Sequence, residues 1–453
     1  MKKCKIILLD PLASGKGLFK HRHFLRDWSG SYNVADIAFP PLDLMYAAAY
    51  LRKFDIDVQI IEASIKHMPH KEVVRDIQKT APDFVFIPTT YFSLDDDKYL
   101  ACLIRNCNKT IKIIFGGPLV TYNPSLVLSD NTADFVALGE LELPLLNIIK
   151  GNFSQNIAHK KNRKVVSGQR CLLDLYDLPI PARDLTDTQA YKYAIFNRKN
   201  PSTVMTISRG CPHSMCKFCP SKLYTLGEMR YRREDSIFEE INEIVFKYKI
   251  GDIFFRDQVF TADRQLVYKI CEYLIKNEID ISWRATTRVD LVDKELLVLM
   301  RRAGCYQLSF GFESASQQIL DINEKGIRVE QSIKAAQWTK EAGIEILGLF
   351  MTGMLGDTKE NIGQLSRFAL DLDVDYVSIN DYLLFPGTQV FEEYVKDKSI
   401  TLPIRLMKQK GLSPVLKFYL RPKYLMRQLT NIRSKEELCF FIKSGINIFL
   451  SEL

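Results

Sequence analysis

The sequence predicts an α/β protein with two successive sheets of parallel strands and a small helical C-terminal segment. Short apolar, β-branched runs alternate with amphipathic stretches of helical spacing through residues 1–150. The alternation starts again at Ser202 and continues to Asn380, whereas only helical spacing remains beyond Phe391. A chain of 453 residues exceeds one ordinary hydrophobic core, so two or three domains are expected.

Residues 1–150 are expected to form a doubly wound, flavodoxin-like parallel sheet. The strands are expected at Lys5–Leu9, Asp57–Ala63, Phe84–Pro88, Ile111–Phe115 and Phe135–Leu138. Ligands of such sheets bind beyond the carboxyl ends of the strands. Small or polar residues follow three of these strands: Thr89, Tyr91, Gly116, Gly117, Gly139 and Glu140.

Residues 151–200 are expected to be a connector without regular structure. They include a basic run from His159 to Lys164, which we interpret as a solvated turn. Pro179 and Pro181 follow and impose an extended path between the two predicted domains.

Residues 201–390 are expected to form a partial (β/α)6 barrel with one open side. The strands are expected at Val204–Ser208, Asp252–Arg256, Ser282–Thr286, Gln307–Phe310, Glu345–Met351 and Tyr376–Asn380. Barrels of parallel strands carry their chemistry at the carboxyl ends of the strands. Polar and small residues gather there in this sequence, among them Asp257, Arg288, Glu313, Ser314 and Gly353.

Three closely spaced thiols follow the first strand of this barrel, in "TVMTISRGCPHSMCKFCPSK". Without a secretory signal, Cys211, Cys216 and Cys219 predict a metal centre rather than a disulfide. Three sulfurs hold three irons of a cubane and leave the fourth iron open. A zinc site and a plant-type ferredoxin cluster are alternatives, although the latter needs a fourth Cys and the next one downstream is Cys271.

The cysteine motif resembles that of radical S-adenosylmethionine enzymes, which have an aromatic residue before the last Cys, here Phe218. The first gap is one residue longer than usual, C-x4-C-x2-C. The resemblance implies a 4Fe-4S cluster that binds S-adenosylmethionine, and "GFES" and "FPGT" match further family motifs. It also implies S-adenosylmethionine contacts from Phe218, Asp257, Arg288, Glu313, Ser314 and Gly353.

Structural roles are alternatives for several of these residues. Glu313 or Ser314 could cap the following helix, and Arg288 could form a structural salt bridge. Gln258 stands where the family more often has a second acid beside Asp257. We interpret His213, between the first two cysteines, as an exposed loop residue rather than a ligand.

The first half resembles the cobalamin-binding domain that precedes many radical S-adenosylmethionine cores, through "PPLDLMYAAAYLRK", "FGGPLVTYNP" and "VALGELELPLL". The resemblance implies that Thr89, Tyr91, Gly116, Gly117, Gly139 and Glu140 contact the corrin. Leu119 stands where the family often has His, and the D-x-H-x-x-G loop is missing. No protein histidine is therefore expected on cobalt. A domain that kept this fold and lost the cofactor is the alternative.

Both resemblances together imply a class B radical S-adenosylmethionine methyltransferase. Such an enzyme makes a 5′-deoxyadenosyl radical and functionalises an unactivated carbon, with cobalamin carrying the methyl group. A cyclase or rearranging enzyme without methyl transfer is one alternative, and a non-catalytic iron-sulfur or corrin module for sensing or electron transfer is another. Methylthiolation of RNA is disfavoured because Cys4, Cys102 and Cys107 do not resemble a second cluster site. No catalytic side chain is predicted.

The net charge of +8 is concentrated in the tail, where residues 401–453 hold ten Lys or Arg and three Glu. The rest is close to neutral, so a nucleic-acid partner is not expected. The basic helices of residues 391–453 are expected to cap the barrel mouth; a peripheral membrane contact is the alternative. Without a signal peptide or membrane-length apolar run, a cytoplasmic location is expected. The expected partners are a small-molecule, lipid or peptide substrate and a reductant such as flavodoxin or ferredoxin.

Overall fold

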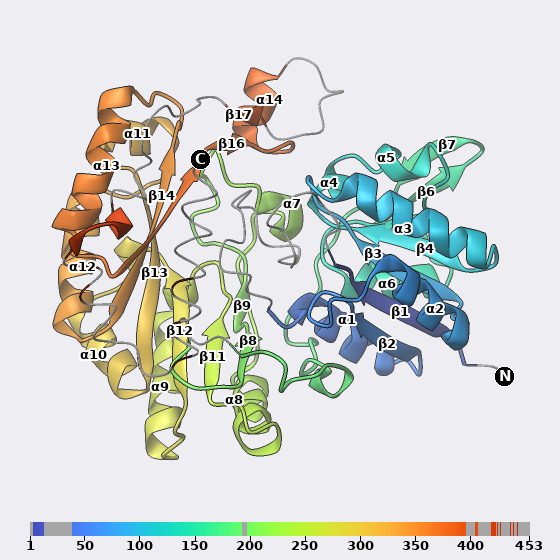
Figure 1. Cartoon of the computed structure of the whole chain (residues 1–453), viewed down its shortest axis with the longest axis horizontal. Helices are drawn as coiled ribbons and strands as arrows, with labels where there is room; N and C mark the ends of the chain where they lie inside the picture. The colour runs from blue at the N-terminus through green and yellow to red at the C-terminus, as the bar shows by residue number, and fades with distance from the viewer. Residues whose placement is uncertain are drawn as a thin grey trace.

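The computed structural model describes residues 3–12, 39–192 and 197–395, and parts of the C-terminal tail at 404–405, 418–422, 424, 426, 435, 438 and 442. The described chain forms two α/β units that lie side by side (Figure 1). The N-terminal unit is blue to teal in that view, and the second unit runs from green to orange. This arrangement confirms the predicted fold class.

The first unit contains a seven-stranded sheet in the order β2-β1-β3-β4-β5-β6-β7. Its strands are β1 (Lys5–Asp10), β2 (Asp57–Glu62), β3 (Phe84–Pro88), β4 (Lys112–Gly116), β5 (Phe135–Ala137), β6 (Ile157–Lys161) and β7 (Lys164–Ser167). Strands β1 to β5 pair in parallel, in the flavodoxin order. Each differs from its predicted range by at most one residue at either end.

Helices cover both faces of this first sheet. They are α1 (Leu42–Arg52), α2 (His70–Thr80), α3 (Leu94–Cys107), α4 (Pro118–Tyr122), α5 (Ser125–Leu128) and α6 (Glu142–Ile149). One apolar cluster joins α1 and α6 to one face, and a second joins α2 to α5 to the other. Because both faces are buried, the central strands read as continuous apolar runs in the sequence.

The strands β6 and β7 were not expected, because the sequence predicted a connector over residues 151–200. They form an antiparallel hairpin that extends the sheet beyond β5. Only Asn162 and Arg163 of the basic run form its turn, with φ values of 51° and 64°, and the rest of the run lies in the two strands, which corrects the expected solvated turn. Lysines and a histidine in these short strands obscured the alternation that would have indicated them. The described residues from 168 to 201 form no regular strand and include the short helix η1 (Arg183–Leu185).

The second unit contains a six-stranded, wholly parallel sheet in the order β15-β14-β13-β12-β11-β8. Its strands are β8 (Ser202–Met205), β11 (Asp252–Phe255), β12 (Ser282–Thr287), β13 (Cys305–Glu313), β14 (Glu345–Thr352) and β15 (Tyr376–Asp381). Among the described residues β8 and β15 are the edges and do not pair with each other. The expected open barrel of six βα units is therefore present.

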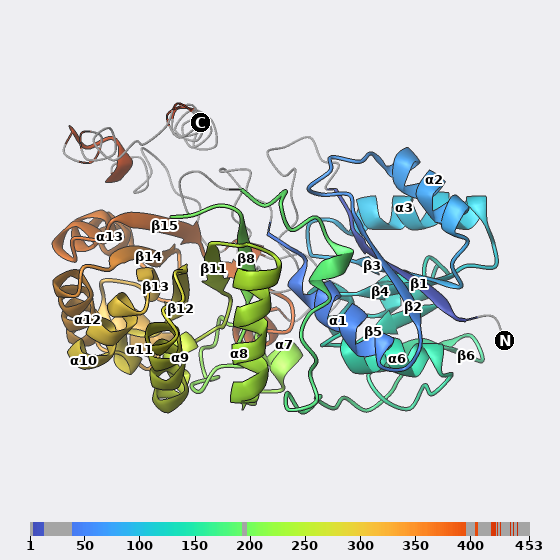
Figure 2. The same cartoon turned by 90° about the horizontal axis from the view of Figure 1, so that it is seen from below.

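Helices form the outer layer of the barrel, as Figure 2 shows from below. They are α8 (Glu234–Asn242), continued by a π-helical turn η2 (Glu243–Lys247), α9 (Arg264–Lys276), α10 (Lys294–Arg302), α11 (Gln317–Ile322), α12 (Val329–Glu341) and α13 (Lys359–Asp371). Short 3-10 turns precede two of them, η3 (Phe260–Ala262) and η4 (Val289–Leu291). One large apolar core, which includes Trp283 and Phe255, lies between these helices and the strands.

Short elements complete the second unit. They are β9 (Ser208–Arg209), α7 (Lys222–Thr225), β10 (Arg230–Tyr231), β16 (Leu383–Leu384), α14 (Gln389–Tyr394) and β17 (Ile404–Arg405). The strands β9 and β10 pair as an antiparallel ribbon, and α7 lies between the two units (Figure 1).

The C-terminal helices predicted for residues 391–453 lie largely outside the described residues. The described part of the tail packs on the barrel, where Phe418 and Tyr424 are buried in its outer core. The Tyr419 hydroxyl donates to the Val377 carbonyl at 2.7 Å and accepts from the Val377 amide at 3.0 Å. Across the described residues, no helix is both long and apolar enough to cross a membrane.

Candidate functional site

The three predicted cluster cysteines lie on one loop, residues 210–229, which we call the cysteine loop. The loop is closed at its base by the β9–β10 ribbon, in which Arg209 pairs with Arg230. It begins at Gly210, with a φ of 112°, and a Cβ there would lie 2.0 Å from the Glu228 carbonyl oxygen. Only glycine fits this position, because the two ends of the loop approach each other here.

Two of the loop thiols, Cys216 and Cys219, are largely shielded from water. Burial raises the pKa of the Cys216 thiol to about 12, and burial also raises that of Cys219, although hydrogen bonding by Ser221 opposes it. Such thiols ligate a metal only on losing their protons, which couples metal binding to proton release. Among the described residues, no three His, Cys, Asp or Glu side chains are arranged to hold a single metal ion. Ligation by the three cysteines therefore stays a prediction.

The cysteine loop rests on the turn between α11 and α12. The Lys217 amide donates to the Asn323 carbonyl at 3.2 Å, and His213 Nε2 lies 2.7 Å from the Glu324 carbonyl oxygen. Gly326 has a φ of 67°, and a Cβ there would lie 2.3 Å from His213 Cε1. His213 is therefore part-buried and not exposed as expected, and it holds the longer first gap of the motif against this turn.

A buried ion pair lies beside the cysteines. Lys325 Nζ is 2.7 Å from Glu313 Oε1 and 5.9 Å from the centre of the Phe218 ring. Burial alone would lower the pKa of Lys325, but the Glu313 carboxylate outweighs it and the pKa is raised. Arg288 donates to the Lys325 carbonyl at 3.2 Å and forms an ion pair with Asp290 at 2.9 Å, which is the structural salt bridge considered as its alternative.

Lys325 was not predicted from the sequence to be a site residue. A lysine in a loop is normally exposed, and no motif marks this one. Only the folded chain shows that it is buried, because the turn that carries it closes over the cysteine loop. Lys325 forms an ion pair with Glu313 of the "GFES" motif, and this ion pair was not predicted from the sequence.

Other predicted S-adenosylmethionine residues have structural partners. Asp257 is buried, and its carboxylate accepts the Ile207 and Ser208 amides at 3.1 Å and 2.7 Å. The Ser314 hydroxyl accepts the amide of Ser316 at 3.2 Å, which is a turn contact before α11 and not a helix cap, because no side chain caps this helix. Gly353, with a φ of 75°, donates its amide to Asp357 at 2.9 Å.

At the carboxyl edge of the first sheet, Thr89, Gly116 and Gly117 meet. The Thr89 amide donates to the Gly116 carbonyl at 2.8 Å, and Gly117 has a φ of 129°. A Cβ at Gly117 would lie 2.0 Å from the Thr89 carbonyl oxygen. The Thr89 hydroxyl is buried with no hydrogen-bond partner among the described residues. A buried, unsatisfied hydroxyl at this edge fits the predicted ligand site.

Two further predicted corrin residues, Tyr91 and Glu140, contact the second unit, whereas the Gly139 amide donates to the Thr121 hydroxyl of the first unit at 3.1 Å. The Tyr91 hydroxyl donates to the Pro386 carbonyl at 2.9 Å, and its ring lies 5.2 Å from that of Phe385. Leu119 is buried in the same small apolar cluster. Glu140 forms ion pairs with Arg209 and Arg230. Tyr91 and Glu140 thus join "FPGT" and the cysteine-loop base to the first sheet.

Comparisons with known proteins agree with this arrangement. The model of the Radical SAM superfamily matches residues 205–369, and that of the B12 binding domain matches residues 33–149. An uncharacterized methyltransferase of Pyrococcus horikoshii is 30% identical over 419 residues, covering 86% of this chain and 90% of the relative. The chain belongs to the cobalamin-binding radical S-adenosylmethionine enzymes. The predicted family is confirmed.

Further relatives support the same family. An anaerobic magnesium-protoporphyrin IX monomethyl ester cyclase of Rubrivivax gelatinosus is 26% identical, covering 83% of this chain and 69% of the relative. The cobalamin-dependent radical enzyme OxsB with aqua-cobalamin bound has a TM-score of 0.74 at 15% identity, over 99% of this chain and 72% of that chain. The methyltransferase TsrM from Kitasatospora setae has a TM-score of 0.66 at 15% identity, over 86% and 74%. These structural likenesses show the fold.

The cofactors of this radical S-adenosylmethionine enzyme are a 4Fe-4S cluster, S-adenosylmethionine and cobalamin. The residues that bind them are assigned below as proposals. The two units meet at an interface that we call the seam. There Glu140 joins the base of the cysteine loop to the carboxyl edge of the B12-binding sheet, and Tyr91 joins that edge to Pro386. A second buried contact involves α1, where Arg232 donates to the Tyr46 hydroxyl at 2.9 Å; α1 and α8 flank this seam in Figure 2.

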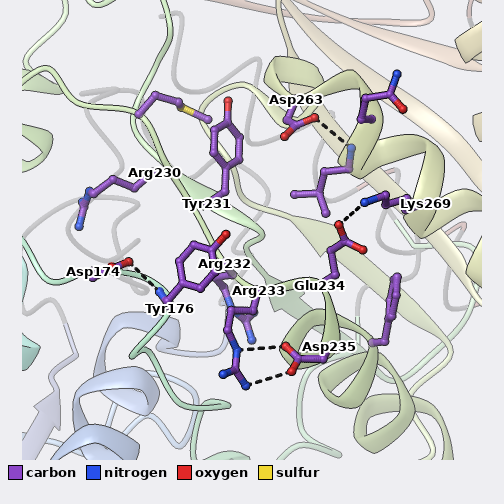
Figure 3. A pocket seen from close by; sticks show the side chains of 14 residues that line it. Asp174, Tyr176, Arg230, Tyr231, Arg232, Arg233, Glu234, Asp235, Asp263 and Lys269 are labelled. Atoms are coloured by element: carbon purple, nitrogen blue, oxygen red, sulfur yellow. Dashed lines mark hydrogen bonds and ion pairs between the residues drawn. The ribbon is translucent and has the colours of Figure 1, made fainter.

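A surface pocket of about 760 Å³ lies where residues 174 and 176 meet Met229 and the helices α8 and α9 (Figure 3). Two ion pairs form within its wall, Arg233 with Asp235 at 3.1 Å and Lys269 with Glu234. The wall does not contain any of the predicted cofactor residues.

Proposed function

We propose that this enzyme transfers a methyl group to an unactivated carbon of a small-molecule, lipid or peptide substrate. The main support is the shared seam: the cysteine loop lies on the carboxyl edge of the B12-binding sheet through the ion pairs of Glu140. One substrate can therefore reach both cofactor sites. The 30% identical relative is also named a methyltransferase.

When bound, the cluster with S-adenosylmethionine supplies a radical that removes hydrogen from carbon, and cobalamin supplies the methyl group. Cys211, Cys216 and Cys219 would hold three irons. The oppositely charged Lys325 and Glu313, beside Cys216, suit the carboxylate and amino groups of the methionine part of S-adenosylmethionine. Their burial strengthens both contacts, because water screens them little.

The corrin would be held at the edge formed by Thr89, Gly116 and Gly117. The Thr89 hydroxyl can donate to one corrin amide, and the glycines allow close approach of a flat ring. The apolar Leu119 cannot ligate cobalt. Tyr91 and Glu140 would act at the rim of this site, because their polar groups already contact the radical SAM domain.

We further propose that a flavodoxin or ferredoxin supplies the electron, and that the enzyme works in the cytoplasm without a nucleic-acid partner. The support is the reducing chemistry of the family and the near-neutral charge outside the tail. The substrate itself is not specified by these features.

The test is an anaerobic incubation of the reduced, reconstituted enzyme with methyl-labelled S-adenosylmethionine and the small-molecule fraction of a cell extract. Methyl transfer uses two molecules per turnover, so S-adenosylhomocysteine and 5′-deoxyadenosine should accumulate in roughly equal amounts while label enters a product. The cyclase of Rubrivivax gelatinosus makes a cyclase or rearranging reaction the second candidate. That reaction would give 5′-deoxyadenosine without S-adenosylhomocysteine. No cleavage of S-adenosylmethionine at all would support the non-catalytic alternative.

A further inference from the structure

We propose that Glu140 is a positioning residue that anchors both ends of the cysteine loop to the B12-binding domain. The sequence assigned this residue to the corrin. The contacts instead place its carboxylate under the base of the loop that carries Cys211, Cys216 and Cys219. The proposal rests on the proposed function only in that this loop holds the cluster.

The two arginines that bracket the loop converge on this one carboxylate. Arg209 directly precedes Gly210, and Arg230 directly follows the last loop residue and pairs with Arg209 across the ribbon. Arg209 Nη1 lies 3.0 Å from Glu140 Oε2, and Arg230 Nη2 lies 2.6 Å from Glu140 Oε1. One carboxylate oxygen of Glu140 thus contacts β9 through Arg209, and the other contacts β10 through Arg230.

These ion pairs are shielded from water. The side chains of Arg209, Glu140 and Arg230 are 2%, 11% and 13% exposed. Exposed ion pairs contribute little, whereas loss of one partner from a buried pair leaves a costly uncompensated charge. Arg209 is held further by Glu142, at 2.6 Å and 3.1 Å, so one strand of the base keeps a second anchor when Glu140 is changed.

The backbone before Glu140 is fixed as well. Gly139 has a φ of 82° and donates its amide to the Thr121 hydroxyl at 3.1 Å. A Cβ at Gly139 would lie 2.7 Å from Arg170 Nη2. A side chain here would therefore move either the strand end or Arg170. The carboxylate of Glu140 is set on a rigid edge of the B12-binding sheet, and any shift of that edge is passed to the cysteine loop.

Hydrogen exchange of the full-length, reconstituted holoenzyme tests this proposal. Glu140→Gln keeps the size and removes the charge. Loss of two charge-assisted hydrogen bonds should raise the exchange of amides in residues 210–229 by about tenfold or more, while the central strands of both sheets keep their protection. The affinity for added hydroxocobalamin should stay within about twofold. The reduced cluster with S-adenosylmethionine should show a broadened or shifted electron paramagnetic resonance signal.

Arg230→Gln should reproduce the effect from the other side of the pair, and the Glu140→Gln, Arg230→Gln double variant should be no worse than the poorer single one. Arg230→Lys, which keeps the charge, should restore most of the protection and guards against a misfolded first variant. The matched control is Glu234→Gln, which removes an exposed ion pair with Lys269 and should leave loop exchange unchanged.

The proposal is overturned if Glu140→Gln leaves loop exchange unchanged. If hydroxocobalamin binding then falls tenfold or more, Glu140 is a corrin contact, as the sequence suggested. If binding is also unchanged, Glu140 contributes nothing to the loop. Both measurements are made without substrate, so a failure of methyl transfer in the earlier test does not affect their outcome.

Discussion

At the scale of single residues, the three loop cysteines and the two core cysteines have different surroundings. Cys211, Cys216 and Cys219 lie on a loop beside charged side chains, whereas Cys271 and Cys305 are fully buried in the apolar core between strands and helices. Burial raises the pKa of Cys271 to about 12, with no ion pair to offset it. Core thiols of this kind behave as small apolar side chains.

Replacing Cys211, Cys216 or Cys219 singly with Ala should therefore abolish the 4Fe-4S cluster. Cys271→Ala and Cys305→Ala should keep it, at a stability cost of about 1 kcal/mol for the small cavity. Iron and sulfide content after anaerobic reconstitution, with the visible absorbance of the cluster, measures this. Full iron content and S-adenosylmethionine cleavage in Cys216→Ala would refute the ligand assignment.

Lys325 offers a second residue-scale prediction. Lys325→Met leaves the Glu313 carboxylate buried and uncompensated, so the free energy of unfolding should fall by about 3–5 kcal/mol. Adding Glu313→Gln should recover most of that loss, because no charge then remains buried. S-adenosylmethionine affinity should stay weak in both variants. Urea unfolding and equilibrium binding measure the two effects, and Lys334→Met on α12 is the exposed control. Full affinity in the double variant would contradict the proposed methionine site.

A further residue-scale prediction, based on Leu119, is that no protein histidine ligates the cobalt. Leu119 is apolar and buried in one cluster with Tyr91 and Phe385, so the position where the family often has His offers no cobalt ligand here. We expect substitutions of His21, His23, His67 and His70 to leave the electron paramagnetic resonance spectrum of the reduced corrin unchanged. Loss of a nitrogen splitting in any of these variants would show a histidine ligand. Failure of the unmodified protein to retain any corrin would favour the alternative in which the domain kept its fold and lost the cofactor.

At the scale of elements, buried strands were predictable and tertiary contacts were not. Strands β1, β3 and β4 are mostly apolar runs, and β1 to β5 all lie within one residue of their predicted ranges. The hairpin of β6 and β7 was not predicted, because lysines interrupt its apolar pattern. The two-residue strands β9 and β10 exist only because Arg209 and Arg230 are brought together by the fold. Likewise, the partners of Glu140 are 69 and 90 positions away in the chain. No local pattern encodes such distances.

The loop that precedes the cysteines gives an element-scale prediction. Asp257→Asn keeps the shape of a side chain that accepts two backbone amides of residues 207 and 208, but it removes the charge. The variant should lose about 1.5–3 kcal/mol of unfolding free energy. Cluster occupancy should fall while the circular dichroism of the barrel is retained. Wild-type iron content together with wild-type stability would show that this carboxylate does not hold the loop.

At the scale of the whole molecule, the uneven charge raises the question of a membrane contact. The described part of the tail packs on the barrel through Phe418 and Tyr424. This packing favours a helical cap on the barrel rather than a surface that contacts a membrane. We expect the full-length protein not to sediment with anionic phosphatidylserine vesicles at low salt. Binding that weakens as salt is added would instead show that the basic helices face lipid headgroups.

The contact of Tyr419 with β15 has a consequence for the solution behaviour of the enzyme. In an open barrel, the edge strand β15 has unpaired backbone N–H and C=O groups on one side. A strand of another chain could pair with these groups. By engaging both the amide and the carbonyl of Val377, one phenol occupies the place of a further strand. Tyr419→Phe should therefore leave catalysis intact yet promote concentration-dependent self-association, visible by light scattering. The Tyr419 hydroxyl therefore protects the open edge of this sheet from pairing with a second molecule.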